Sequence, residues 1–161
     1  MINWCLLPYE QLNLQQLERW LQLRQQIFVV EQQCPYNDID GRDAQALHLL
    51  GFVGEQLMAG ARLFAPTESE PFSRIGRVVV APEYRAGGRG RELMRQALAH
   101  CCRLWPQWPV RISAQAHLQS FYAALGFVPI SDLYDEDGIP HLAMECATPL
   151  SPSVASAPSA Q

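Results

Sequence analysis

A glycine-rich segment follows a β-branched run in the middle of the chain. Val78-Val79-Val80 leads through Pro82 into Arg85-Ala86-Gly87-Gly88-Arg89-Gly90-Arg91, and apolar residues at helical spacing come next. A strand that enters such a turn and then opens a helix aims unpaired backbone N–H groups and the positive end of a helix dipole at one place. Glycine lets an anion approach the backbone without a Cβ in the way. The segment therefore predicts a phosphate-binding loop.

Positive charge is concentrated at this loop. The chain has 161 residues and 12 positive side chains, all of them arginine, and four of these, Arg85, Arg89, Arg91 and Arg95, lie in the loop or the helix after it. The absence of lysine excludes a P-loop and lysine covalent chemistry, and Leu93 stands where a dinucleotide fingerprint needs its third glycine. Backbone amides and arginines are left to hold a phosphate.

Hydrophobic periodicity and turn residues indicate the elements that must position this loop. The order is strand, helix, three strands, helix, strand, helix and two strands, which predicts one α/β domain with a mixed sheet over residues 1–146. A tail rich in Pro, Ser and Ala, residues 147–161, is expected to be flexible. The predicted strands are 2–7, 48–53, 57–64, 75–80, 110–114, 127–133 and 141–145, and the predicted helices are 12–30, capped by Asn13, 92–101 and 118–125.

A polar loop over residues 31–43 concentrates negative charge. It contains Glu31, Asp38, Asp40 and Asp43, and a long polar loop in a compact domain often carries function. A second acidic segment, 135–137, is predicted to form a turn between the last two strands. These acids would suit a cationic amine, or they serve only for solubility.

Composition excludes several classes of function. Sixteen acids against 12 arginines give a net charge of -4, which argues against nucleic acid as a main partner. No apolar run approaches the length that spans a membrane. The five cysteines and four histidines lack the paired spacings of metal sites, so no metal is expected. Reduced thiols are the simplest interpretation of the cysteines, and they predict a cytoplasmic protein.

Two motifs resemble those of the GNAT superfamily of N-acetyltransferases. Arg85-x-x-Gly88-x-Gly90 is similar to its acyl-CoA loop, and Phe121-Tyr122-Ala123-Ala124-Leu125-Gly126-Phe127 is similar to its second signature. The resemblance covers about residues 2–145 and implies one domain with a mostly antiparallel sheet flanked by helices. The chain looks closest to the ElaA-like proteins through Arg24-x-x-x-Phe28-Val29-Val30-Glu31-Gln32-x-Cys34-Pro35-Tyr36-x-Asp38-x-Asp40-Gly41 and Gly138-Ile139-Pro140-His141.

The resemblance implies a site for acetyl-CoA. The amides of residues 86–91 would hold the pyrophosphate, the strand 78–80 would pair with the pantetheine arm, and an amide near Val78 would face the thioester carbonyl. Tyr122 would protonate the departing thiolate. Gln115 replaces the usual Asn, and Leu118 replaces a small residue. The expected CoA-binding residues are Val78, Val79, Val80, Arg85, Ala86, Gly87, Gly88, Arg89, Gly90, Arg91 and Gln115.

The general base is not evident from the family pattern. Arg74 occupies the position that holds a glutamate base in some members. An amine must lose a proton before it attacks, so a carboxylate or a histidine is expected near the acyl carbon. Glu31 is the first candidate and His141 the second, while a purely structural or solvated role is the alternative for each. Asp40 and His48 are further candidates for the base, and the acceptor site is expected to contain Glu31, Tyr36, Asp40, His48 and His141.

The function that these observations predict is transfer of an acetyl group from acetyl-CoA directly to a primary amine, carried by a small metabolite or a peptide. One alternative is an enzyme like the acyl-homoserine-lactone synthases, suggested by Arg24-x-x-x-Phe28 and the acids after it. Another is a CoA-binding module without turnover. No nucleic acid or membrane partner is expected, and a homodimer is compatible with the sequence.

Overall fold

The computed structural model describes residues 1–147. Apart from Ala147, the predicted tail lies outside the described residues. The strands are β1 (Asn3–Pro8), β2 (Leu47–Val53), β3 (Gln56–Phe64), β4 (Ser73–Val80), β5 (Val110–Gln115), β6 (Val128–Pro129), β7 (Tyr134–Glu136) and β8 (Ile139–Cys146). The α-helices are α1 (Leu14–Arg24), α2 (Arg89–Leu104) and α3 (Gln119–Ala123), and a π-helix, η2 (Gln25–Glu31), continues α1. Short 3₁₀ turns are η1 (Tyr9–Gln11), η3 (Asp43–Gln45), η4 (Pro82–Tyr84) and η5 (Ala116–Leu118).

The strands form one mixed, mostly antiparallel sheet, as predicted. Its order is β1-β2-β3-β4-β5-β8-β6, and β7 pairs with β8. The pair β4–β5 is parallel and the other pairs in the described chain are antiparallel. The crossover that makes β4 and β5 parallel contains the glycine-rich loop and α2, as a parallel connection requires.

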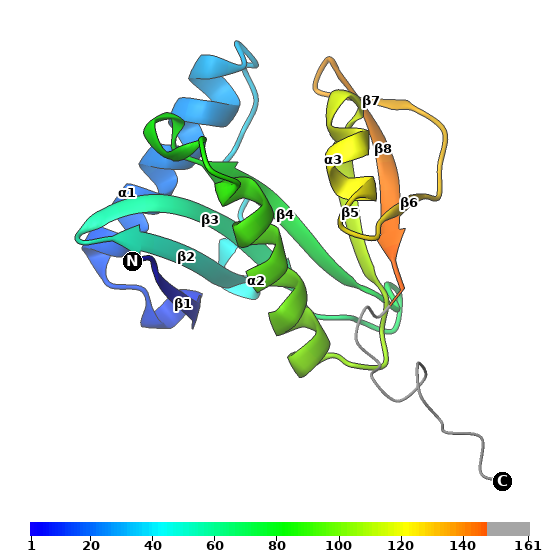
Figure 1. Ribbon diagram of the computed structural model, residues 1–161, viewed down its shortest axis with the longest axis horizontal. Helices are drawn as coiled ribbons and strands as arrows, with labels where there is room; N and C mark the ends of the chain where they lie inside the picture. Colours follow the sequence, from blue (N-terminus) through cyan, green and yellow to red (C-terminus); the bar gives the residue numbers. More distant parts are fainter. Residues whose placement is uncertain (148–161) are drawn as a thin grey trace, which may run out of the picture.

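Two hydrophobic clusters fix helices to opposite faces of the sheet. On one face, Trp20 and Ile27 pack against Leu50 and Val79. Trp20 lies so close to β3 that a Cβ on Gly60 would meet its ring at 2.5 Å. On the other face, the buried side of α2 joins α3 and the strands, and α2 crosses in front of the sheet in Figure 1. The core residues of this second cluster include Leu49, Met58, Leu63, Leu93, Met94, Ala97, Ile112, Tyr122 and Met144.

The first predicted helix is two kinds of helix in succession. Asn13 caps α1 as expected, because its side chain accepts from the Gln16 N–H at 2.8 Å while the Gln16 side chain accepts from the Asn13 N–H at 3.0 Å. After Arg24 the helix widens into η2, where the Gln32 N–H bonds to the Ile27 carbonyl five residues back. Such π-segments often occur at functional sites.

The end of the domain differs from the prediction. Only Val128–Pro129 of the predicted strand 127–133 is a strand, and the acidic stretch predicted as a turn contains β7. The actual turn is Asp137-Gly138, with φ of +53° and +81°. An Asp-Gly pair adopts these left-handed angles easily and joins antiparallel strands, so β7 and β8 form a hairpin.

Candidate active site

A cleft opens where β4 and β5 part. The two strands pair only at Ser73–Val110 and Arg74–Arg111, and beyond these positions they diverge, as Figure 1 shows. The cleft has a volume of about 820 Å³ and is lined by β4, β5, the end of η2, the loop after it, α3, and the β7–β8 hairpin. Separated strands expose backbone groups that a sheet would otherwise pair, and an extended ligand can bind to them.

A β-bulge in β4 lies on the wall of this cleft. Gly60 is opposite Val79 and Arg62 is opposite Gly76, so Arg77 and Val78 together face Ala61. Arg77 has a φ of +50°, outside the usual strand range. A bulge leaves one residue unmatched in the ladder and turns its neighbours. The backbone next to Val78, which lines the cleft, is therefore not held by a regular strand pair.

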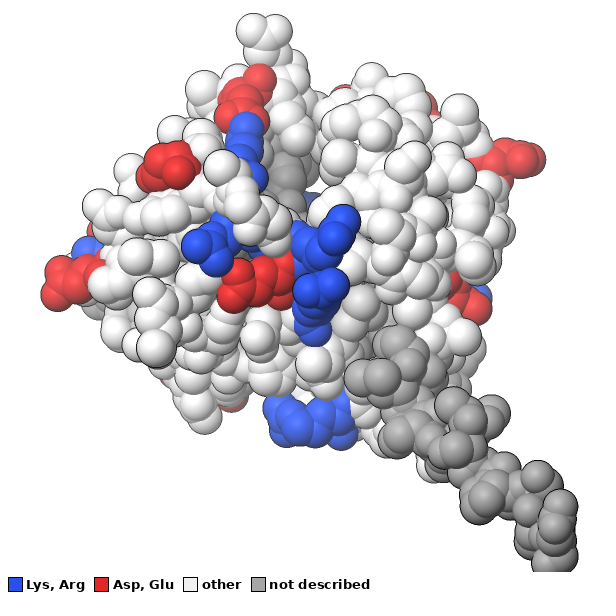
Figure 2. Space-filling view, viewed as in Figure 1, with Lys and Arg blue, Asp and Glu red and all other residues white. Residues whose placement is uncertain are grey.

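The glycine-rich loop forms the start of α2. Gly87 and Gly88 each have a φ of +75°, and Gly88 occupies the N-cap position without a side-chain hydrogen bond. The first N–H groups of α2 therefore remain without a capping side chain. Arg85, Arg91 and Arg95 are exposed. Figure 2 shows basic side chains gathered over α2 and the loop before it. This geometry suits a phosphate group.

Tyr122 lines the cleft from α3. Only 7% of its surface is exposed, and its ring lies edge-on to Phe121 and Phe127, with centroid distances of 5.1 Å and 5.9 Å. Burial raises the pKa of Tyr122 to about 12, because the apolar surroundings disfavour the phenolate. The phenol is therefore a protonated group in the cleft at neutral pH.

Glu31 lines the cleft at the end of η2 and is paired with the glycine-rich loop. Its carboxylate lies 2.7 Å from the Arg85 guanidinium, which also donates from Nε to the Val80 carbonyl at 3.3 Å. Both charged side chains are nearly half exposed. Glu31 and Arg85, which the sequence places on the acceptor side and the CoA side respectively, are thus in direct contact.

His141 lines the cleft from β8 and has an acidic partner. Its Nδ1 lies 2.7 Å from the Ile139 carbonyl oxygen, and its Nε2 lies 3.0 Å from a Glu136 carboxylate oxygen. The ring stacks on Tyr134 at a centroid distance of 6.3 Å. Sequence reasoning assigned Glu136 to a turn. The β7–β8 hairpin instead brings it to the cleft wall beside His141.

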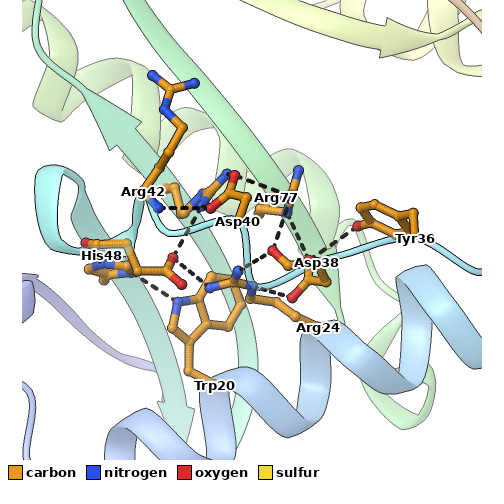
Figure 3. Close-up of polar contacts among 10 residues, drawn as sticks. Trp20, Arg24, Tyr36, Asp38, Asp40, Arg42, His48 and Arg77 are labelled. Carbon is orange, nitrogen blue, oxygen red and sulfur yellow. Dashed lines mark hydrogen bonds and ion pairs between the residues drawn. The ribbon is translucent and has the colours of Figure 1, made fainter. Parts of the chain in front are cut away.

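The acidic loop does not present free negative charge, in contrast to the expectation from sequence. Three of its acids are held by three arginines from α1, β3 and β4 (Figure 3). Arg24 bonds Asp38 at 2.9 Å and Asp43 at 2.8 Å, and all three side chains are buried. We call this group the arginine–aspartate network; its members are Arg24, Arg62, Arg77, Asp38, Asp40 and Asp43.

Electrostatics keep Asp40 and Asp43 of the network ionised. Arg62 bonds both carboxylate oxygens of Asp40, at 2.8 Å and 2.9 Å, and these bonds hold the pKa of Asp40 well below its usual range. Burial raises the pKa of Asp43, but the bonds and charges of Arg24 and Arg62 outweigh it, so the net pKa of Asp43 is lowered. Arg77 completes the network with an ion pair to Asp38 at 2.8 Å.

His48 belongs to the core rather than to the acceptor site, which corrects the expectation from sequence. It is fully buried and does not line the cleft. Trp20 donates from Nε1 to its Nδ1 at 3.0 Å, and its Nε2 donates to the Asp43 carbonyl at 2.8 Å. Burial is the main cause that lowers the pKa of His48, so the ring is neutral.

Of the other predicted residues, Tyr36, Asp40, Gln115, residues 78–80 and Arg85 line the cleft, whereas residues 86–91 lie outside its lining. Tyr36 and Asp40 lie on its acceptor side, and the Tyr36 hydroxyl donates to Asp38 at 3.1 Å. Gln115 donates from its side chain to Gln32 at 3.2 Å, which joins β5 to the loop after η2. Val78, Val79, Val80 and Arg85 line the donor side. No group of His, Cys, Asp or Glu side chains that could hold a metal ion occurs within residues 1–147.

Comparison with known proteins agrees with this geometry. The family model "Acetyltransferase (GNAT) domain" matches residues 10–148. Protein ElaA of Escherichia coli K12 is 44% identical over 146 residues, which are 89% of this chain and 95% of ElaA. The crystal structure of an acyl-CoA N-acyltransferase from Pseudomonas aeruginosa has a TM-score of 0.87 and 43% identity, covering 91% of this chain and 100% of that one. The crystal structure of E. coli ElaA has a TM-score of 0.85, 43% identity and the same coverage.

The chain thus shares its fold with a solved acyl-CoA N-acyltransferase and matches the model of an acetyltransferase domain, which defines its class as an acyltransferase. The chain belongs to the GNAT acetyltransferase family, and within it to the ElaA-like proteins. In addition, none of the helices in the described part of the chain has the length and apolar character to cross a membrane.

Proposed function

We propose that this protein transfers an acetyl group from acetyl-CoA directly to a primary amine. One observation carries the proposal: the parting of β4 and β5 places a bulged strand and the protonated phenol of Tyr122 in one cleft. A thioester seated beside the bulge would have a backbone donor on its carbonyl and a proton donor near its sulfur. Acyl transfer to an amine needs both.

The donor side of the cleft would bind the CoA part. The backbone amides of residues 86–91 and the positive end of α2 would hold the pyrophosphate, with exposed arginines neutralising its charge. The pantetheine arm would run along residues 78–80, which line the cleft beyond the last β4–β5 pair. An amide near Val78 would then donate to the thioester oxygen, where negative charge develops as the amine attacks.

The proton balance of the transfer can be written with these groups. The amine nitrogen forms a bond to the thioester carbon, which gives a tetrahedral intermediate with its negative charge on the carbonyl oxygen. Collapse breaks the carbon–sulfur bond, and Tyr122 donates its proton to the CoA thiolate. The attacking nitrogen loses its proton to a base or a water. Buffer protons restore the phenol before the next cycle.

The pair of His141 and Glu136 is our candidate for the base. His141 is nearly buried in the cleft, and Glu136 lies 3.0 Å from its Nε2, so a proton taken from the amine would be shared with a carboxylate. Glu31, the first candidate from sequence, has a carboxylate oxygen 2.7 Å from the Arg85 guanidinium. Glu31 is better suited to holding the glycine-rich loop against η2.

Release of free CoA from acetyl-CoA with a panel of amines tests the proposal. The panel should include simple amines, amino acids, peptides and an S-adenosylmethionine-type amine, with binding of CoA measured separately by calorimetry. We expect CoA binding and thiol release that requires an amine, with acylated amine as product. Binding without release for any acceptor would contradict the proposal and favour a CoA-binding module. Thiol release with the S-adenosylmethionine-type amine alone would favour the lactone-synthase alternative.

A further inference from the structure

One arginine beside the arginine–aspartate network has no acidic partner. Arg42 is next in sequence to the turn that carries Asp40, and its backbone N–H donates to Asp40 at 3.0 Å. Its side chain extends away from the network, as Figure 3 shows. The three aspartates are already bound by three other arginines. In the described chain the Arg42 guanidinium therefore keeps a positive charge that no carboxylate neutralises.

A flat apolar surface holds the Arg42 guanidinium in the cleft. It lies 4.6 Å from the centroid of the Phe64 ring, and both residues line the cleft. Stacking of this kind costs a guanidinium few of its hydrogen-bonding positions, because the N–H groups point outward in the plane. Arg42 is half-buried, so its conformational freedom is already reduced before a ligand binds.

Two more arginines lie at this end of the cleft, each of them paired with an acid. Arg62 lies 5.2 Å from the Phe64 ring and has a buried Nε without a hydrogen-bond partner. Arg74 is the cross-strand partner of Phe64 and lines the cleft, and its acidic partner Glu70 is exposed. The glycine-rich loop follows the opposite end of β4, so the CoA phosphates are not the anion that this cluster would meet.

The opposite wall of the same cleft is acidic. Glu136 and Asp137 line it from the β7–β8 hairpin, with His141 beside them. An acceptor that spans the two walls would place a cationic amine near Glu136 and an anionic group near Arg42. The loop over residues 31–43 thus offers the acceptor a cation, although its composition is acidic.

We propose that Arg42 binds a carboxylate of the acceptor, and that the acceptor is an amine that also carries a carboxylate, as amino acids do. The inference rests on the proposed acyl transfer and specifies its substrate class. A planar guanidinium stacked on Phe64 can donate two parallel hydrogen bonds to a carboxylate. Because Arg62 and Arg74 are each paired with an acid, Arg42 is the cation of this end that is left for the carboxylate.

Matched acceptor pairs test the inference. Thiol release is measured with amino acids and with the corresponding carboxamides, which keep the amine and lose the negative charge, each at a pH that gives equal fractions of free amine. Wild type should have a kcat/KM at least roughly 10-fold higher for the acids, since a charged hydrogen bond contributes about 1.5–3 kcal/mol. Arg42→Gln should lower kcat/KM for the acids by roughly 10- to 100-fold, mainly through KM, with little change for the amides.

Three further measurements separate the outcomes. Arg42→Lys keeps the positive charge but loses the two parallel N–H donors. Its kcat/KM for the acids should lie between the values of wild type and Arg42→Gln. Arg103→Gln, on the last turn of α2 and outside the cleft, is the matched control and should behave as wild type. Equal rates with acids and amides, or an Arg42→Gln enzyme that reacts normally, would overturn this inference and leave acyl transfer standing. If the protein binds CoA but releases no thiol with any of the amines, both the inference and the proposed acyl transfer are overturned.

Discussion

Two groups of arginines in this protein have different surroundings. In the arginine–aspartate network Arg24 and Arg62 are buried, at 0% and 4% exposure, Arg77 is 22% exposed, and each is bound to carboxylates. Those of the glycine-rich loop and the start of α2 are open to solvent, with Arg85 at 45% and Arg89 at 43%. Arg85 and Arg89 also have acidic partners, Glu31 and Glu92, so the two groups differ in burial rather than in pairing.

The two groups should respond differently to substitution. Removing one member of a buried ion pair leaves an uncompensated charge in the interior, whereas an exposed pair contributes little to stability. The network also positions the loop that carries Tyr36 and Arg42 at the cleft. A change in the buried group should therefore act on folding, and a change in the exposed group should act on CoA.

The largest expected effect is that of Arg24→Met. It would leave Asp38 and Asp43 buried with fewer partners, so we expect a loss of about 3–5 kcal/mol in the free energy of unfolding. Urea denaturation followed by circular dichroism measures it. Arg89→Gln is the matched control and should cost less than about 1 kcal/mol, because its pair with Glu92 is exposed. Equal costs for the two variants would refute the distinction between the groups.

Tyr122→Phe should affect rate without affecting stability in the same proportion. The variant keeps the ring between Phe121 and Phe127 and removes the proton donor, so kcat should fall by roughly 100-fold. The wild-type rate should not decline from loss of this proton until the pH nears its pKa of about 12. Steady-state thiol release and calorimetric CoA binding measure the two parts. Unchanged turnover would remove Tyr122 from the mechanism.

A smaller effect is expected from the double variant Arg89→Gln/Arg91→Gln. Two fewer charges at the start of α2 should raise the KM for acetyl-CoA several-fold and weaken its dependence on salt. Thermal stability should stay within about 0.5 kcal/mol of wild type, as is usual for surface substitutions. A large loss of stability with unchanged KM would reverse the roles that we assign to the two groups.

The smallest effect concerns His48, which joins the network through the Asp43 carbonyl. Its pKa is lowered from 6.5 in the folded protein, so the unfolded chain binds the proton first as pH falls. The contribution of His48 to stability is therefore complete above pH 6.5 and is lost progressively below it. When the pH is lowered from 7.5 to 5.5, the free energy of unfolding should decrease less for His48→Gln than for wild type. The exposed-site variant His117→Gln, as the control, should show the same decrease as wild type. Equal pH slopes for wild type and His48→Gln would contradict this assignment.

The sequence predicts much of the fold because its signals are local. Three glycines after a β-branched strand, an Asn cap, and Gly-Glu-Gln between two apolar runs each determine structure within a few residues. The Asp137-Gly138 turn was equally local, but the acids around it suggested a longer polar turn and concealed β7. The family signature, rather than periodicity, pointed to Tyr122.

The candidate site was harder to predict because its contacts are distant in sequence. Arg24 and Asp43 are 19 residues apart in the sequence. Asp38 lies in a loop that precedes β3 in the chain, and Arg77 lies in the strand that follows it. Nothing in the sequence of the acidic loop shows that arginines elsewhere neutralise it. His48 was assigned to the acceptor site because the sequence does not reveal that Trp20 binds its ring.

Two side-chain contacts join parts of the site that are far apart in sequence and are therefore synthesised at different times. Gln115 reaches Gln32, 83 positions away, and the Cys34 thiol reaches the Asp137 carbonyl, 103 positions away, at 3.2 Å each. The N-terminal wall of the cleft can make these contacts only after β5 and the hairpin that carries His141 have been synthesised. A chain that ended before residue 134 would lack β7 and β8, and with them Glu136 and His141 on the cleft wall. The acyl transfer that we propose would therefore need nearly the whole domain to have been synthesised.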